Sequence, residues 1–121
     1  RLAGERDRLR VVDDQWGTPT LAGDLAAALL ALALREDLSG RRGIYHFANR
    51  GETTWCRFAR EIFALSAARG GPSAEVEAIT TADFPTPARR PANSRLSTGR
   101  IERDFGIVPR QWDDALKDVI A

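Results

Sequence analysis

The stretch Leu9-Arg10-Val11-Val12-Asp13-Asp14-Gln15-Trp16-Gly17-Thr18-Pro19-Thr20 changes character twice within a few residues. Its first part, Leu9 to Val12, is a short β-branched run that predicts a strand, and the two aspartates after it predict a turn. Gly17 and Pro19 interrupt the polar residues that follow, so we expect a loop there. Thr20 is a suitable N-cap for a helix that starts immediately afterwards. The stretch therefore predicts a strand, a loop and a helix in succession.

Downstream, the apolar residues recur with helical and strand periodicity in turn. Leucines at helical spacing predict a helix from residue 21 that Ser39-Gly40 ends. A strand is predicted at 43–48, followed by a helix that Thr53 or Thr54 caps and whose apolar stripe runs from Trp55 to Leu65. A strand at 75–79 and a loop at 80–96 come next. The last two elements are a short helix that Ser97 or Thr98 opens and Gly106 ends, and a helix from Trp112 to Ile120. This order predicts a small α/β fold.

The predicted strand at 43–48 carries apolar side chains on both faces. Ile44 and Ala48 fall on one face, and Tyr45 and Phe47 fall on the other. A strand that is apolar on both sides is typical of the interior of a larger α/β sheet. We therefore expect the chain to be a subdomain that completes a partner domain.

Composition excludes several classes of protein. The chain of 121 residues is one domain at most, with 43% hydrophobic and 29% charged residues, as in ordinary globular proteins. A net charge of +1 gives no basis for binding nucleic acid or an anionic membrane. With Cys56 and His46 as its only cysteine and histidine, the chain can form neither an internal disulfide nor a multi-histidine metal site. The longest apolar run, Leu25 to Leu34, is too short to span a bilayer.

The first ten residues are charged throughout and do not resemble a signal peptide. The chain contains no methionine, so we expect it to be a segment of a longer protein. These features predict a cytoplasmic location.

The sequence shows no catalytic apparatus of its own. Gly70-Gly71 follows a predicted helix instead of a strand, so it is not a dinucleotide-binding turn. Tyr45 is followed four residues later by Asn49 and not by a lysine. We interpret His46 as a packed or hydrogen-bonded structural residue and Cys56 as a small buried one.

Two loops carry groups that suit a polar ligand. Residues 15–20 offer a side-chain amide, hydroxyls and a helix start, which suit phosphate or sugar hydroxyls, although a structural turn explains them equally well. Residues 86–94 place Arg89 and Arg90 between prolines, and a guanidinium grips phosphate with two parallel hydrogen bonds. The alternative for this second loop is a solvated arginine pair on a proline-rich connector.

The residues of both loops resemble a known family. Residues 11–20, 43–49 and 84–94, together with Thr54-Trp55 and the later Phe105-Gly106-Ile107, are similar to segments of dTDP-4-dehydrorhamnose reductases in order and spacing. The resemblance runs over nearly the whole chain.

This resemblance implies the C-terminal, substrate-binding portion, residues 1–121, of an extended short-chain dehydrogenase/reductase whose Rossmann half is absent. It implies that NADPH or NADH is bound by that missing N-terminal domain, which also holds a catalytic Tyr-Lys pair, and it leaves a divalent metal open. Arg90 best matches an arginine that contacts the substrate diphosphate in related enzymes, with Arg89 as the alternate. The other expected substrate-binding residues are Gln15, Thr18, Asn93 and Ser94.

The implied activity is reduction of the C4 keto group of dTDP-4-dehydrorhamnose to dTDP-L-rhamnose, with the isolated chain inactive. The implied partners are the dTDP-sugar, the chain's own Rossmann domain and a second copy in a homodimer. Two alternatives stay open: a non-catalytic regulatory subunit of the same superfamily, and a related dTDP-deoxysugar 4-ketoreductase.

Overall fold

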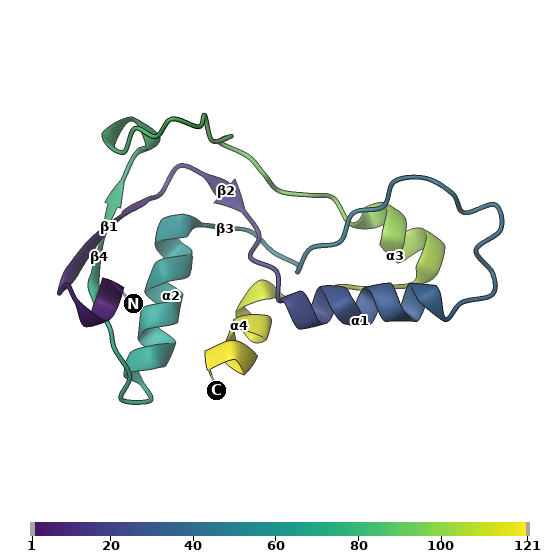
Figure 1. Ribbon diagram of the computed structural model, residues 1–121, viewed down its shortest axis with the longest axis horizontal. Coiled ribbons are helices and arrows are strands. Elements are labelled where there is room, and N and C mark those ends of the chain that lie inside the picture. The colour runs from purple at the N-terminus through teal and green to yellow at the C-terminus, as the bar shows by residue number, and fades with distance from the viewer. Residues whose placement is uncertain (1, 121) are drawn as a thin grey trace.

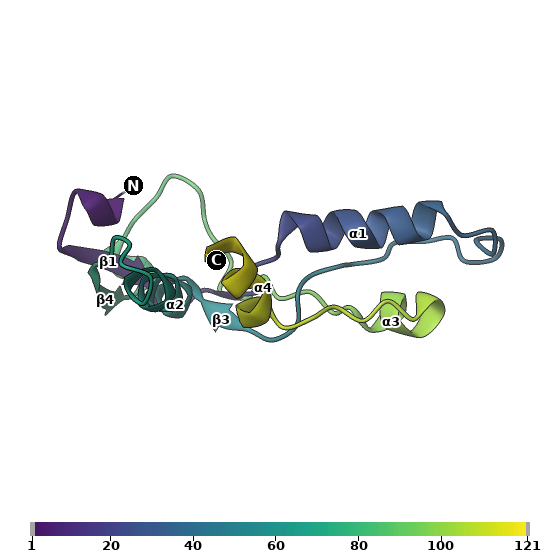
Figure 2. The same ribbon diagram turned by 90° about the horizontal axis from the view of Figure 1, so that it is seen from below.

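Two groups of elements lie end to end along an elongated molecule in the computed structural model, which describes residues 2–120 (Figure 1). One group contains the strands β1 (Arg8–Val12) and β4 (Glu75–Ile79) with the helices α2 (Trp55–Ala67) and α4 (Trp112–Ile120), and the other contains the helices α1 (Ala22–Ala33) and α3 (Gly99–Phe105). Seen at right angles, the molecule is thin, with few layers of chain across its depth (Figure 2). This mixed α/β arrangement confirms the predicted fold class.

The structure confirms the two strands predicted near residues 9–12 and 75–79. β1 (Arg8–Val12) pairs with β4 (Glu75–Ile79) in parallel, with Val12 opposite Ile79. The two strands form a ladder by themselves, and a short 3₁₀ turn at Leu2–Gly4 precedes them. Val76 and Ile79 are buried where α2 packs against the strands.

Helix α2 (Trp55–Ala67) begins where the sequence predicts. The Thr54 hydroxyl accepts a hydrogen bond from the Arg57 backbone N–H at 3.3 Å, which satisfies one of the unpaired donors of the first turn. The Phe58 ring meets Trp112 edge-on, with centroids 5.9 Å apart, and so joins α2 to α4 (Trp112–Ile120). Cys56 is fully buried, as expected.

Helix α1 (Ala22–Ala33) differs from its prediction at both ends. Leu21, and not Thr20, occupies the N-cap position, because the Thr20 hydroxyl instead accepts a hydrogen bond from the Asn49 backbone N–H at 3.2 Å. The helix ends at Ala33, well before Ser39-Gly40. After the helix, the Arg35 backbone N–H donates to the Leu32 carbonyl, and the Arg35 side chain donates to the Asp37 carboxylate.

Helix α3 (Gly99–Phe105) follows Thr98 and ends at Gly106, as predicted. Gly106 has a φ of 67°, a left-handed conformation that favours glycine after a helix. The Arg41 guanidinium donates to the Asp104 carbonyl at 2.7 Å and the Arg35 guanidinium to the Phe105 carbonyl at 3.0 Å. These two contacts supply partners for carbonyls that the helix end leaves free.

The prediction of a strand at 43–48 is wrong. No neighbouring strand among residues 2–120 forms a ladder with this segment. The carbonyl groups of Arg42 and Ile44 instead accept hydrogen bonds from the Arg100 guanidinium, both at 3.1 Å. Ile44 is 76% exposed, and His46 is also exposed, so the interpretation of His46 as a packed residue is not borne out. Tyr45, on the other face, packs on Phe105 and donates to Asp104.

Helix α1 carries exposed leucines, of which Leu29 is 58% and Leu30 is 60% exposed. We predict that the isolated chain self-associates through these leucines, because contiguous exposed apolar surface favours association. Sedimentation velocity should show species larger than a monomer. A Leu29→Glu/Leu30→Glu variant should sediment as a monomer, whereas Glu36→Ala, outside the helix, should behave like the parent chain. A compact monomer with a sharp melt at high temperature would contradict this expectation.

Candidate functional site

The two loops singled out in the sequence are joined by backbone hydrogen bonds. β2 (Trp16–Gly17) pairs with β3 (Thr53–Thr54) in antiparallel fashion, and on its other side Trp16 forms an isolated parallel bridge with Asn93. The Trp16 N–H donates to the Ala92 carbonyl at 2.8 Å, and the Ser94 N–H donates to the Trp16 carbonyl at 2.8 Å. The second loop is therefore anchored on the first.

The other end of the second loop is anchored on the same stretch. The Asp14 carboxylate accepts hydrogen bonds from the backbone N–H of Thr81 at 2.9 Å and from its hydroxyl at 2.6 Å. These bonds hold the pKa of Asp14 below its usual value. The Gln15 side-chain amide donates to the Thr81 hydroxyl oxygen at 3.2 Å. A 3₁₀ turn at Thr81–Asp83 follows this anchor.

Residues 84–91 thus form a loop with both ends fixed on residues 14–16, which we call the arch. In Figure 2 the arch, in green, stands away from the strands and from α2 before it returns toward α4. The Thr86 hydroxyl donates to the Ala88 carbonyl at 2.7 Å within it. Fixed ends and prolines at 85, 87 and 91 reduce the conformational entropy that the arch loses when it binds a ligand.

A cleft of about 140 Å³ lies beside the point where the loops meet. Three of the six predicted site residues line it: Gln15, Thr18 and Ser94. The Thr18 hydroxyl donates to the Gly51 carbonyl at 2.7 Å, and the Ser94 hydroxyl donates to the Trp16 carbonyl at 3.1 Å. With their protons used internally, these hydroxyl oxygens and the Gln15 amide oxygen remain acceptors for a ligand that carries O–H groups.

Gly17 allows this close approach. A Cβ atom at position 17 would lie 2.8 Å from the Ser94 hydroxyl oxygen, closer than real side chains come. A larger residue at this position would displace the Ser94 hydroxyl, so the glycine that marks a loop in the sequence also favours the close packing of the two loops.

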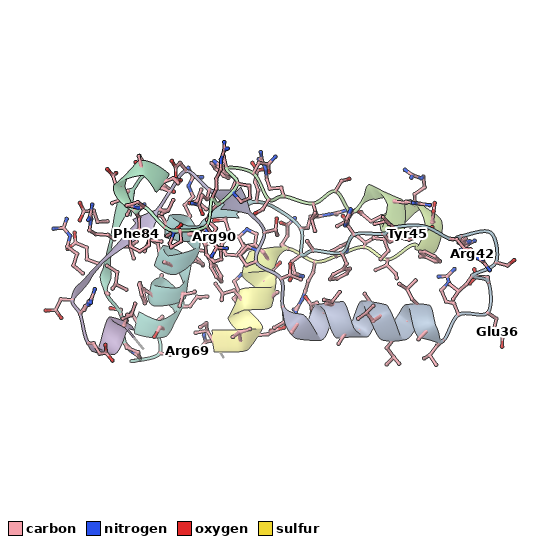
Figure 3. All side chains as sticks on the ribbon, turned by 45° about the horizontal axis from the view of Figure 1, so that its top comes forward. Glu36, Arg42, Tyr45, Arg69, Phe84 and Arg90 are labelled. Carbon is pink, nitrogen blue, oxygen red and sulfur yellow. The ribbon has the colours of Figure 1, made fainter. Side chains whose placement is uncertain are left out.

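The remaining three predicted residues do not line the cleft. Arg89 and Arg90 are exposed on the arch, and neither side chain has a hydrogen-bond or ion-pair partner among residues 2–120 (Figure 3 labels Arg90). The side-chain amide oxygen of Asn93 accepts from the Arg95 backbone N–H at 3.0 Å and from the Arg95 side chain at 2.8 Å. The structure thus brings Gln15, Thr18 and Ser94 together and leaves two unpaired guanidinium groups next to them in the chain.

Sequence reasoning missed the opposite wall of the cleft. That wall is formed by Thr53, Thr54, Trp55 and Phe58, whereas Trp16, Gly17 and Pro19 belong to the loop at 15–20 that the sequence singles out. The guanidinium carbons of Arg57 and Arg95 lie 4.9 and 5.8 Å from the centroid of the Trp16 ring, within the range of cation–π attraction. The sequence pattern places Trp55 in the apolar stripe of α2, so the 59% exposure that makes it part of this wall had no signal in the sequence.

The described part of the chain contains no group of three or more His, Cys, Asp or Glu side chains placed to hold a metal ion. Within residues 2–120 no strand leads through a glycine-rich turn into a helix. No helix in this range is both long and apolar enough to cross a membrane.

Comparison with known proteins agrees with the resemblance seen in the sequence. The model of a family described as the RmlD substrate binding domain matches residues 1–121. A dTDP-4-dehydrorhamnose reductase of Sinorhizobium fredii is 40% identical over 123 residues, which cover 99% of this chain and 42% of the relative.

Two solved structures extend the comparison. A dTDP-4-dehydrorhamnose reductase of Clostridium acetobutylicum superposes with a TM-score of 0.86 at 36% identity, covering 98% of this chain and 40% of the other. One of Bacillus anthracis, in complex with NADP, superposes with a TM-score of 0.83 at 29% identity, covering 98% and 39%. The chain therefore spans about two fifths of the length of the relatives it matches.

Proposed function

Because the chain belongs to the RmlD substrate binding domain family, we propose that it is the part of a dTDP-4-dehydrorhamnose reductase that binds the nucleotide sugar. The observation that carries this proposal is the backbone bridge between Trp16 and residues 92–94. That bridge joins an arch that bears two unpaired arginines to a cleft that has both hydrogen-bond acceptors and an apolar wall. A ligand with a hydroxylated sugar at one end and a diphosphate beside it matches this arrangement.

The cleft suits the sugar. A hexose presents several O–H donors, and the acceptor oxygens of Gln15, Thr18 and Ser94 can receive them. The apolar wall formed by Trp55 and Phe58 suits the C–H face of the same ring. Because the side chains are held by hydrogen bonds within the chain, the sugar is oriented by groups that need little rearrangement.

The arch suits the diphosphate. A guanidinium that has no carboxylate partner has its charge unneutralised and its N–H donors free for the ligand. We assign the main contact to Arg90, with Arg89 as the alternate, and a supporting contact to the amide nitrogen of Asn93. Asp14, which anchors the arch, is bound to Thr81, and Glu52 is paired with Arg95.

In the whole enzyme we propose that the C4 keto group of dTDP-4-dehydrorhamnose is reduced to give dTDP-L-rhamnose. NADPH or NADH would supply the hydride from an N-terminal Rossmann domain, which would cover the exposed leucines of α1 and the exposed face of Ile44. The contribution of this chain is to bind and orient the sugar nucleotide. The homodimer and the cytoplasmic location stay predictions.

Calorimetric titration tests whether this chain binds the sugar nucleotide while the N-terminal domain binds the cofactor. We predict that the isolated chain neither binds NADPH measurably nor oxidises it in the presence of dTDP-4-dehydrorhamnose. The full-length protein that contains this chain should bind both NADPH and dTDP and turn the substrate over. A micromolar dissociation constant for NADPH on the isolated chain would contradict the assignment, and a full-length protein without turnover would favour the non-catalytic subunit.

A further inference from the structure

Both ends of the arch are held by three consecutive residues, Asp14, Gln15 and Trp16. The Trp16 backbone holds the end at residues 92–94, beside the cleft. At the other end Asp14 is bonded to Thr81, and we call this pair of residues the clasp. Two residues of chain span about 7 Å at most, so the clasp and the Trp16 bridge keep the two ends of the arch close together.

The clasp joins two residues that are 67 positions apart in the sequence. The Thr81 backbone N–H lies 2.9 and 3.0 Å from the two carboxylate oxygens of Asp14, and the Thr81 hydroxyl donates to one of these oxygens at 2.6 Å. Because these bonds keep the pKa of Asp14 below its usual value, the carboxylate is ionised in neutral solution, and hydrogen bonds to a charged acceptor are stronger than neutral ones. The clasp therefore fixes both the backbone and the side chain of Thr81.

The turn that follows Thr81 connects the clasp to the arch. The hydroxyl and the backbone N–H of Thr80 each donate to the Asp83 carboxylate at 3.0 Å. The Asp83 N–H donates back to the Thr80 carbonyl at 3.1 Å, and the Phe84 N–H donates to the Thr81 carbonyl at 3.2 Å. Two of the next three residues are prolines, which restrict the backbone directly after this turn. The direction in which the arch leaves the turn therefore depends on the clasp.

We propose that Asp14 and Thr81 are positioning residues, which set the arch so that its arginines face the diphosphate. Among residues 2–120, no hydrogen bond or ion pair joins residues 85–91 to another part of the chain, so the position of the arch is set from its ends. A loop that is already held in its binding position loses less conformational entropy when the ligand arrives. The proposal rests on the proposed function, since it explains how the same arch is held.

Binding of dTDP to the full-length protein, measured by calorimetry, tests the clasp. Thr81→Val keeps the shape of the side chain and removes the hydroxyl donor. It should weaken dTDP binding roughly 5- to 30-fold, which corresponds to ordering about one further residue when the ligand binds. Thr81→Ser keeps the hydroxyl and should stay near wild type. Thr98→Val is the matched control and should leave the dissociation constant unchanged, because the Thr98 hydroxyl also donates to a carboxylate at 2.6 Å, that of Glu102 in α3.

Kinetics separate positioning of the arch from a purely structural role. Thr81→Val should raise KM for the keto-sugar nucleotide and leave kcat and KM for NADPH near wild type, because a contact remote from the reacting carbonyl contributes equally to the ground state and the transition state. A purely structural role would lower the melting temperature and change the constants of both substrates. Asp14→Asn is a second variant of the clasp. Removing a negative charge alone would tighten the binding of an anion, so weaker dTDP binding in Asp14→Asn has the sign that loss of the clasp predicts.

A double-mutant cycle shows whether the clasp acts through the arginines. Thr81→Val should have no further effect in the Arg90→Ala background, or in Arg89→Ala if that arginine makes the contact. An undiminished effect there would assign it to Gln15, whose amide donates to the Thr81 hydroxyl, and would overturn the clasp. Unchanged dTDP affinity in both Thr81→Val and Asp14→Asn would also overturn it and leave the proposed function intact. If the wild-type protein binds no dTDP, or if neither arginine contributes to binding, the proposed function of the arch fails as well.

Discussion

Replacing Arg90 by alanine in the full-length protein is expected to weaken dTDP binding by about 2–4 kcal/mol, or roughly 30- to 1000-fold. A diphosphate must lose water when it enters a cleft, and a guanidinium replaces that water with two charge-assisted hydrogen bonds of about 1.5–3 kcal/mol each. Arg90 has no competing partner among residues 2–120, and prolines on either side restrict its backbone. The measurements are the dissociation constant for dTDP and KM for the keto-sugar nucleotide.

Two variants give this prediction its controls. Arg90→Lys should recover only part of the affinity, because one ammonium group cannot make the planar two-point contact. Arg89→Ala has the same exposure and charge and should cost much less. If Arg89→Ala raises both constants while Arg90→Ala leaves them near wild type, the contact belongs to Arg89. If neither variant changes them, the arch has no role in holding the diphosphate.

Replacing Asn49 by alanine is expected to lower the free energy of unfolding by about 2–4 kcal/mol. Asn49 is only 3% exposed, and its amide oxygen accepts from the Leu21 backbone N–H at 2.8 Å. Its amide nitrogen donates to the Asp24 carboxylate at 2.8 Å and to the Arg110 carbonyl at 3.4 Å. Truncation leaves several of these groups without a partner, at about 1–3 kcal/mol for each buried one.

Urea denaturation of the full-length protein measures the effect. Asn93→Ala is the matched control, because its amide lies on an exposed loop and bonds only to Arg95. It should change the free energy of unfolding by less than about 0.5 kcal/mol. An Asn49→Ala protein as stable as the wild type would show that Asp24 and Arg110, which pair at 2.8 Å, hold α1 without help from the amide.

Much of the fold follows from patterns within the chain. The strands at 8–12 and 75–79 and the helices that start near Thr54 and Thr98 are where periodicity and capping residues predict them. The segment at 43–48 is the exception. A strand forms only when a neighbouring strand accepts and donates its backbone hydrogen bonds. The apolar pattern of this segment does not show whether residues 2–120 contain such a neighbour. Ile44 and the leucines of α1 remain exposed in residues 2–120 for the same reason.

Individual residues of the candidate site could be predicted from the sequence, but the contacts that bring its two loops together could not. Gln15 and Arg90 stand out in the sequence by their side chains and their proline-rich surroundings. The bridge beside the cleft is made by backbone groups of Trp16, Ala92 and Ser94. Backbone hydrogen bonds between distant segments can form with almost any residue type, so the sequence does not reveal them. The exposure of Trp55 and Phe84 is likewise a property of the folded chain, since both residues fit a buried pattern equally well.

A crystal structure of the full-length protein with dTDP tests the central proposal most directly. We predict a diphosphate oxygen within hydrogen-bonding distance of the Arg90 guanidinium, and open space for a sugar between the diphosphate and the side chains of Gln15, Thr18 and Ser94. A nucleotide held only by the N-terminal domain, with residues 84–94 free of contact, would contradict the assignment of this chain as the part that binds the substrate.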